Sequence, residues 1–229
     1  MLNIQAIFDS IDGEVNGFNG AGELCTFIRL RGCNLRCEFC DTKYAQDQKA
    51  KELKSVEDIL KLNILPKVTI TGGEPLIQEE TTQLVLGLLD RKHRVSIETN
   101  GSLSVSHDLF NHMLAKENLR LIVDYKLPSS KMEDQMRAMT FFQLRDCDVI
   151  KFVIDGINDF YIARGLVLAN RDTWKARKVF SPAIKYSDIF TGWPKALAEM
   201  MIDEAHMIPD VSYSLQIHKV LWPGATHER

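Results

Sequence analysis

Three cysteines within eight positions are the clearest chemical feature of this chain. Cys33, Cys37 and Cys40 have the spacing C-x3-C-x2-C and closely follow an apolar run that ends at Leu30. Iron–sulfur clusters take one cysteine thiolate per iron, so three cysteines on a four-iron cluster leave one iron open to a ligand. A Cys3His zinc site is the alternative, but the nearest downstream histidine, His93, lies far outside the usual zinc spacing. The spacing favours a cluster and leaves zinc open.

A second polar motif, GGEPL (72–76), directly follows the apolar run KVTIT (67–71). Glycine lets a backbone approach a ligand closely, and the Glu74 carboxylate can accept hydrogen bonds from an ammonium group. Alone, the motif reads as a strand-to-helix turn, but its place one strand after the cysteine loop favours a ligand site. The segments ETNG (98–101) and DYKLPSS (124–130) follow later apolar runs and are further candidate contact loops.

These motifs need a scaffold in which the ends of several strands meet. Runs rich in Val and Ile alternate with helical patterns, as in parallel sheets that are covered on both faces. The alternation predicts right-handed βαβ units, in an open doubly wound sheet or a partial (β/α) barrel, with ligands at the carboxyl ends of the strands. The expected strands cover 23–30, 67–71, 94–98, 119–125, 148–154, 177–181 and 211–217. The expected helices cover 55–62, 78–91, 106–116, 131–144, 157–169 and 194–207.

The composition is that of one ordinary soluble domain over residues 1–229, with 45% hydrophobic and 26% charged residues. A formal net charge of −3 provides no bulk attraction to nucleic acid or to an anionic membrane. No apolar run approaches the roughly 20 residues of a membrane-spanning helix, and the N-terminus lacks the pattern of an export signal. We therefore expect a cytoplasmic protein, in which Cys25 and Cys147 are small buried core residues.

Two of the motifs resemble those of a known enzyme superfamily. The three cysteines, with Phe39 before the last of them, resemble the signature of the radical S-adenosylmethionine (SAM) superfamily, and GGEP resembles its motif for the amino group of SAM. More specifically, the chain resembles the 7-carboxy-7-deazaguanine synthase family of the queuosine and 7-deazapurine pathway. The matching segments are FDSIDGE (8–14), TFIRLRGC (26–33), CDT (40–42), TGGEPL (71–76), ETNG (98–101), DYKLPSS (124–130) and QIHK (216–219). The resemblance implies a partial TIM-like (β/α) barrel of about six parallel strands, with a cluster loop at 32–42 and a C-terminal strand and tail (211–229) that close the site.

The resemblance also implies a role for each matching residue. Cys33, Cys37 and Cys40 would ligate one [4Fe–4S] cluster, and Thr42 would ligate Mg²⁺, an oxygen-preferring ion. The residues beside SAM would be Phe39, Cys40, Asp41, Gly73, Glu74, Gly101, Asp124, Tyr125 and Lys126. Those beside the substrate would be Ile11, Asp12, Gly13, Arg29, Thr99, Gln216 and His218. The Arg29 guanidinium suits a carboxylate, whereas Asp12 stands where the family usually has Gln. No residue is assigned as an acid or base, because the cluster and SAM carry the chemistry.

By this resemblance the chain would convert 6-carboxy-5,6,7,8-tetrahydropterin to 7-carboxy-7-deazaguanine with release of ammonia. The reduced cluster would cleave SAM, and the 5′-deoxyadenosyl radical would take a hydrogen from C6 of the pterin. The substrate radical would contract its ring, and SAM would be regenerated. Mg²⁺ would bridge Thr42 and the substrate carboxylate. A homodimer and an external flavodoxin- or ferredoxin-like reductant are expected. Two alternatives remain open, a radical SAM activase that installs a glycyl radical on a partner enzyme and a non-catalytic zinc-binding module.

Overall fold

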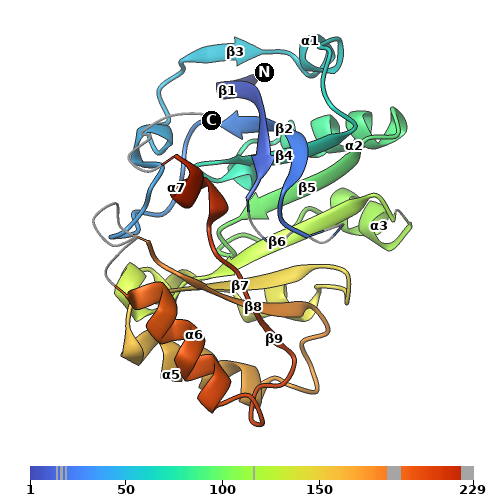
Figure 1. Cartoon of the computed structure of the whole chain (residues 1–229). Coiled ribbons are helices and arrows are strands. Elements are labelled where there is room, and N and C mark those ends of the chain that lie inside the picture. The colour runs from blue at the N-terminus through green and yellow to red at the C-terminus, as the bar shows by residue number, and fades with distance from the viewer. Residues whose placement is uncertain (14, 16–17, 19, 116, 185–191, 223–229) are drawn as a thin grey trace.

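A computed structural model describes the chain except for residues 14, 16–17, 19, 116, 185–191 and 223–229 (Figure 1). The described residues form one nine-stranded sheet in the order β3-β1-β2-β4-β5-β6-β7-β8-β9. Neighbouring strands pair in parallel from β2 to β9, whereas β1 pairs antiparallel with both β2 and β3. The strands are β1 (Leu2–Asp12), β2 (Glu23–Leu30), β3 (Glu52–Lys54), β4 (Lys67–Gly72), β5 (Arg94–Thr99), β6 (Leu119–Tyr125), β7 (Val149–Ile154), β8 (Arg177–Pro182) and β9 (Val211–Tyr213).

Helices α1 to α6 pack against one face of this sheet, whereas α7 lies on the pocket side. Leucine and valine side chains of α2 and aromatic and small side chains of α5 share one buried core with alternate residues of the strands. Val68 and Ile70 of β4 face this core, as do Val95 and Ile97 of β5. The helices are α1 (Val56–Leu60), α2 (Thr81–Asp90), α3 (His107–Ala115), α4 (Ala138–Phe142), α5 (Ile157–Ala169), α6 (Trp193–Asp203) and α7 (Ile217–Leu221). Ser55 caps α1, since its side chain accepts a hydrogen bond from the Asp58 amide.

The other face of the sheet carries polar side chains and a small apolar cluster (Ile122, Val149 and Val179), and it curves around a pocket. Thr71 of β4 and Lys151 of β7 alternate with core residues, and both line the same pocket. Residues of β1 also line it, although β1 and β7 are separated by four strands in the sheet order. Strands so far apart can share one pocket only where the sheet curves strongly, as in a barrel. The prediction of a partial (β/α) barrel with about six parallel strands is confirmed.

The segment after β9 crosses the open side of this barrel. Figure 1 shows it running from β9, beside β8, to α7, which lies near the N-terminal strands. Ser214 donates its amide hydrogen to the Phe180 carbonyl and accepts one from the Val15 amide at its side chain (3.3 Å). The Ile217 amide then donates to the Gly13 carbonyl (3.1 Å). The last part of the predicted closing tail, 223–229, lies outside the described residues.

Three sequence predictions are wrong. A helix over 131–144 does not form, because Lys131 takes a left-handed conformation (φ 59°) and only Ala138–Phe142 becomes α-helical. The predicted strand 211–217 ends at Tyr213, after which the chain leaves β8 and forms α7. Cys147 is half-buried rather than buried, whereas Cys25 is buried as expected.

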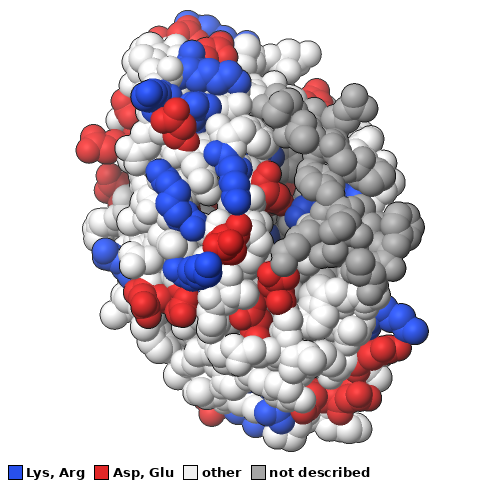
Figure 2. All heavy atoms as spheres, turned by 90° about the vertical axis from the view of Figure 1, so that its left-hand side faces the viewer, with Lys and Arg blue, Asp and Glu red and all other residues white. Residues whose placement is uncertain are grey.

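No helix in the described part of the chain is long and apolar enough to cross a membrane. On the face drawn in Figure 2, Lys and Arg side chains lie among Asp and Glu side chains. This face therefore presents no extended field of one sign.

Candidate active site

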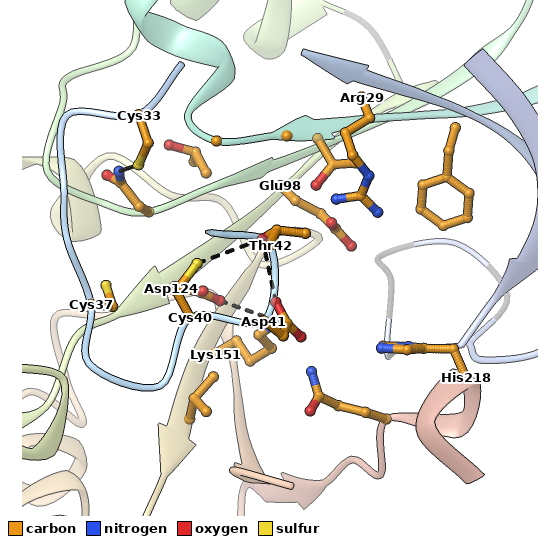
Figure 3. Close-up of a pocket in the computed structure, with 18 of the residues that line it drawn as sticks. Arg29, Cys33, Cys37, Cys40, Asp41, Thr42, Glu98, Asp124, Lys151 and His218 are labelled. Atoms are coloured by element: carbon orange, nitrogen blue, oxygen red, sulfur yellow. Dashed lines mark hydrogen bonds and ion pairs between the residues drawn. The ribbon is translucent and has the colours of Figure 1, made fainter. Parts of the chain in front are cut away.

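One pocket gathers most of the residues that the sequence singled out. Among those predictions, it is lined by Ile11, Asp12, Gly13, Arg29, Cys33, Cys37, Phe39, Cys40, Asp41, Thr42, Gly73, Thr99, Asp124, Lys126, Gln216 and His218. Figure 3 shows the three cysteines on one side of the pocket, Arg29 and His218 on the opposite side, and Asp41 and Thr42 between them. Segments from both ends of the chain therefore meet at one site.

The three cysteine thiols line one pocket but do not converge on a single position. Cys33, Cys37 and Cys40 line the same pocket, yet within the described residues no three His, Cys, Asp or Glu side chains converge tightly enough to hold a single metal ion. Zinc requires four ligands at about 2.0–2.3 Å, whereas a four-iron cluster takes each thiolate at a different iron. The arrangement fits a cluster better than zinc. Burial raises the pKa of the Cys33 and Cys37 thiols, so iron binding must displace their protons.

Loops after three neighbouring strands hold the cysteine loop in place. The Glu74 amide after β4 donates to the Gly32 carbonyl (2.8 Å), and the Glu38 amide donates to the Ser130 carbonyl after β6 (3.1 Å). Asn100, after β5, directs its side-chain amide at the Cys33 sulfur (3.8 Å). A Cβ on Gly73 would lie 2.1 Å from the Gly32 carbonyl oxygen. Gly73 is therefore required for the close approach of these two loops.

Glu74 does not line the pocket, although its sequence motif places it beside SAM. Its side chain is fully buried, and Oε1 accepts hydrogen bonds from the Leu76 amide (3.0 Å) and the Thr99 hydroxyl (2.7 Å). Oε2 accepts one from the Asn100 amide (2.7 Å). Burial raises the pKa of Glu74, an effect that these hydrogen bonds oppose. In this structure the carboxylate fastens the end of β5 to the GGEP turn.

Two other residues predicted beside SAM also lie outside the pocket lining. Gly101 has φ 76°, and a Cβ there would lie 2.5 Å from the Asp124 carbonyl oxygen, so this glycine serves the packing of β5 against β6. The Tyr125 ring packs against Phe141 and Trp174 at centroid distances of 4.8 and 5.9 Å. Alternation along β6 explains this, because Asp124 and Tyr125 are consecutive and point to opposite faces.

Two lysines form ion pairs with one carboxylate, Asp124 of β6, in the pocket. Asp124 accepts from the ammonium groups of Lys126 (2.7 Å) and Lys151 (3.3 Å). Burial opposes ionisation of Asp124, but the two lysines hold its pKa below the usual range. The Lys126 ammonium also favours the thiolate form of Cys37. Lys151 was not predicted, although a lone lysine within the apolar run DVIKFVI was the available signal.

Arg29 offers an unused hydrogen-bond donor to the pocket. Its buried Nε has no hydrogen-bond partner, and its guanidinium carbon lies 5.9 Å from the centroid of the Phe8 ring. Phe8 and Phe27 are paired across β1 and β2, and their rings stack at 5.5 Å. A guanidinium beside aromatic rings suits a flat anionic ligand. Phe8 was missed as a pocket residue because β1 was not among the predicted strands.

The side chain of Asp12 binds other residues of the protein. It is 2% exposed, forms an ion pair with the buried Lys67, and accepts a hydrogen bond from the Thr69 hydroxyl (3.2 Å). Because Lys67 balances the charge, a carboxylate is tolerated where an amide is the family's usual choice.

Asp41 and Thr42 stand between the cysteines and the tail. The Thr42 hydroxyl lies 3.7 Å from the Cys40 sulfur and donates to Asp41 (3.3 Å). Asp41 in turn pairs with Lys219 of α7 (3.2 Å). Desolvation opposes ionisation of Asp41, but Lys219 and His218 bring its pKa down to about 2. Gly72, Glu98 and Asn100 also line the pocket, as expected for members of the GGEPL and ETNG motifs. Pocket-lining residues to which the sequence assigned no individual role are Phe8, Phe27, Leu35, Tyr44, Gln46, Thr71, Lys151, Val153 and Lys219.

Comparison with known proteins agrees with this geometry. Residues 27–132, which include all three pocket cysteines, match the Radical SAM superfamily. A chain with this parallel barrel and this cysteine loop is a radical SAM enzyme, which uses a [4Fe–4S] cluster and SAM.

More specific similarity extends over nearly the whole chain. It is 36% identical over 220 residues to the 7-carboxy-7-deazaguanine synthase of Clostridium acetobutylicum, covering 94% of this chain and 93% of that one. The synthase of the same name from Thermoplasma acidophilum is 32% identical over 96% of both chains. The chain belongs to the 7-carboxy-7-deazaguanine synthase family.

Solved structures share the fold. The crystal structure of QueE from Escherichia coli has a TM-score of 0.67 and 22% identity, covering 94% of this chain and 93% of that one. Streptococcus suis SuiB bound to S-adenosylmethionine has a TM-score of 0.60 and covers 80% of this chain and 48% of that one. Family membership sets aside both alternatives from the sequence, the glycyl-radical activase and the zinc module.

Proposed function

We propose that this chain converts 6-carboxy-5,6,7,8-tetrahydropterin to 7-carboxy-7-deazaguanine and ammonia. The main support for this proposal is one pocket that combines the three cysteines of the cluster loop with Arg29, whose buried Nε has no hydrogen-bond partner. Curated relatives at 36% and 32% identity over most of the chain carry this synthase name.

One side of the pocket would hold both the cluster and SAM. Cys33, Cys37 and Cys40 would hold the cluster, and Phe39, Asp41, Gly73, Asp124 and Lys126 would flank SAM from the same pocket. Together, the bound cluster and SAM supply a hydrogen-atom abstraction that starts the ring contraction. Glu74, Gly101 and Tyr125 would act on this region indirectly, through the loops that they position.

The opposite side of the pocket would bind the pterin. Arg29 donates to its carboxylate, and the Phe8 and Phe27 rings beside it form an apolar wall. The backbone of Ile11 and Gly13, together with Thr99, Gln216 and His218, completes the surroundings of the substrate. Asp12 is held by Lys67 and shapes the site through its backbone.

Thr42 is the proposed ligand of a Mg²⁺ ion. Its hydroxyl lies beside Asp41 and faces the same pocket as Arg29. Mg²⁺ usually keeps several waters and takes one or two protein oxygens plus anionic oxygens of the substrate. A single hydroxyl ligand together with the substrate carboxylate therefore suffices for this assignment, and the ion would fix the carboxylate during the rearrangement.

Assembly, location and electron supply remain predictions. We propose one domain over 1–229, a homodimer in the cytoplasm, and a small flavodoxin- or ferredoxin-like protein as electron donor. Size-exclusion chromatography with light scattering tests the dimer, and a monomer at micromolar concentration would contradict it.

The function is tested by anaerobic reconstitution of the protein with iron and sulfide. Addition of reductant, SAM, Mg²⁺ and the carboxypterin should give a product with the mass of 7-carboxy-7-deazaguanine. Cys37→Ala should lose the cluster and all turnover, whereas Cys147→Ala, which changes a cysteine outside the pocket lining, should keep both. Zinc without iron after anaerobic purification, or deoxyadenosine formed only with a partner protein, would contradict the proposal.

A further inference from the structure

The Lys219 ammonium group joins three segments of the fold. Lys219 belongs to α7, is 8% exposed and lines the pocket. Its Nζ lies 3.2 Å from an oxygen of Asp41 in the cluster loop and donates to the Ile184 carbonyl just after β8 (3.0 Å). One side chain thus links the C-terminal segment, the cluster loop and the end of the barrel.

The residues that flank this contact belong to different parts of the proposed site. Asp41 lies between Cys40, a proposed cluster ligand, and Thr42, the proposed Mg²⁺ ligand. His218, the neighbour of Lys219, faces the pocket from the opposite side (Figure 3). A shift of α7 relative to the cluster loop would therefore change the separation between the SAM side and the pterin side.

The rest of the C-terminal segment also contacts the barrel. Between β9 and Lys219, it is held by Ser214, which contacts β8 and Val15, and by the Ile217 amide, which donates to Gly13. A Cβ on Gly13 would lie 3.1 Å from the His218 amide nitrogen, so the tail packs closely against the end of β1. These contacts bring the tail across the open side of the barrel, and the ion pair of Lys219 with Asp41 lies at the end of this crossing.

From these contacts we propose that Lys219 is a positioning residue, which fastens the C-terminal segment to the cluster loop and keeps the pterin side of the pocket closed. The inference rests on the proposed function for its substrate, but the tether itself is a property of the protein alone. Lys219 is buried, whereas the Asp41 side chain is 39% exposed, so solvent weakens part of this ion pair. The carboxylate and the buried carbonyl together still give the ammonium group two charge-assisted hydrogen bonds. Removing the ammonium group leaves both acceptors without this donor.

Three substitutions separate the tether from packing. Lys219→Met keeps a long apolar side chain and removes the charge, while Lys219→Arg keeps the charge. The matched control is Lys195→Met on α6, where the lysine side chain is 80% exposed and pairs with Glu199 one turn away. We expect the methionine variant at 219 to be defective, the arginine variant to recover most of the loss, and the control to match the wild type.

The first readout is hydrogen exchange of the protein without substrate. We expect the Ile217 amide to exchange about tenfold faster in Lys219→Met, because local opening loses a charge-assisted hydrogen bond. Exchange in the core strands β4 to β7 should not change. Uniform acceleration over the whole chain would indicate general destabilisation and would overturn the proposal, as would unchanged exchange at Ile217.

The second readout is turnover by the reconstituted enzyme. A loosened tail should raise KM for the carboxypterin about tenfold and increase the amount of deoxyadenosine released per product, because the site no longer excludes water. Unchanged values of both, or failure of Lys219→Arg to restore either, would overturn the proposal. If the wild type forms no product from the carboxypterin, the proposed function fails, while the exchange experiment still tests the tether.

Discussion

Glu74 provides a sharp test of how the GGEP turn is built. Its buried carboxylate accepts three hydrogen bonds, two at Oε1 and one from the Asn100 amide at Oε2. Glu74→Gln keeps a hydrogen-bond acceptor at Oε1 but turns an amide NH₂ toward the Asn100 N–H. Two donors then face each other, and leaving a buried N–H unsatisfied costs about 1–3 kcal/mol. Since burial raises the pKa of Glu74, removal of its charge offsets part of this loss.

We therefore expect Glu74→Gln to lower the free energy of unfolding by about 1–2 kcal/mol, a shift in melting temperature of roughly 2–8 °C. Urea and thermal unfolding of the metal-free protein measure it. The exposed Glu79 supplies the control, because Glu79→Gln should change stability by less than about 0.5 kcal/mol. Equal stability of the two variants would refute the assignment of Glu74 as the fastening between β4 and β5.

Three further predictions concern the pocket. Arg29→Met should raise KM for the carboxypterin roughly 10- to 100-fold, as expected for loss of a charge-assisted pair; steady-state kinetics with an unchanged KM would contradict the carboxylate contact. Thr42→Ala should abolish the response to Mg²⁺ while iron content stays unchanged, and a normal Mg²⁺ titration would count against this ligand. Burial opposes ionisation of Asp124, but Lys126 and Lys151 lower its pKa in the folded protein. The ionised Asp124 therefore stabilises the fold above its unfolded-state pKa, and this stabilisation is lost as pH falls. Urea unfolding should therefore show that the wild type loses more stability than Asp124→Asn between about pH 5 and pH 3, and parallel profiles would contradict the pairing.

The parallel core could be predicted because its signal is local. Strands buried on both faces read as short continuous apolar runs, and β2 (Glu23–Leu30) and helix α5 (Ile157–Ala169) have the bounds that the sequence gives. Strand β1 was not predicted, because it pairs antiparallel with β2 and mixes apolar with polar residues. The helix predicted over 131–144 failed because Lys131 adopts a left-handed turn that apolar spacing does not reveal.

The site divides in a similar way. The cysteine spacing favours a cluster over zinc, and the GGEP turn becomes a candidate ligand site because it follows the next strand after the cysteine loop. The resemblance to a known superfamily makes both assignments specific. The partners of Asp12 and Asp41 could not be read from the sequence, because Lys67 and Lys219 come from distant parts of the chain and meet them only after the barrel closes. Burial of Glu74 was missed for the same reason, since its acceptor role depends on the end of β5.

The central claim is that this pocket contracts a pterin ring and uses SAM as a cofactor. The most direct measurement is the stoichiometry of a single anaerobic reaction with the reconstituted protein. For each carboxypterin consumed, the account predicts one 7-carboxy-7-deazaguanine and one ammonia, with SAM undiminished after many turnovers. Consumption of one SAM per turnover, or loss of carboxypterin without release of ammonia, would contradict it.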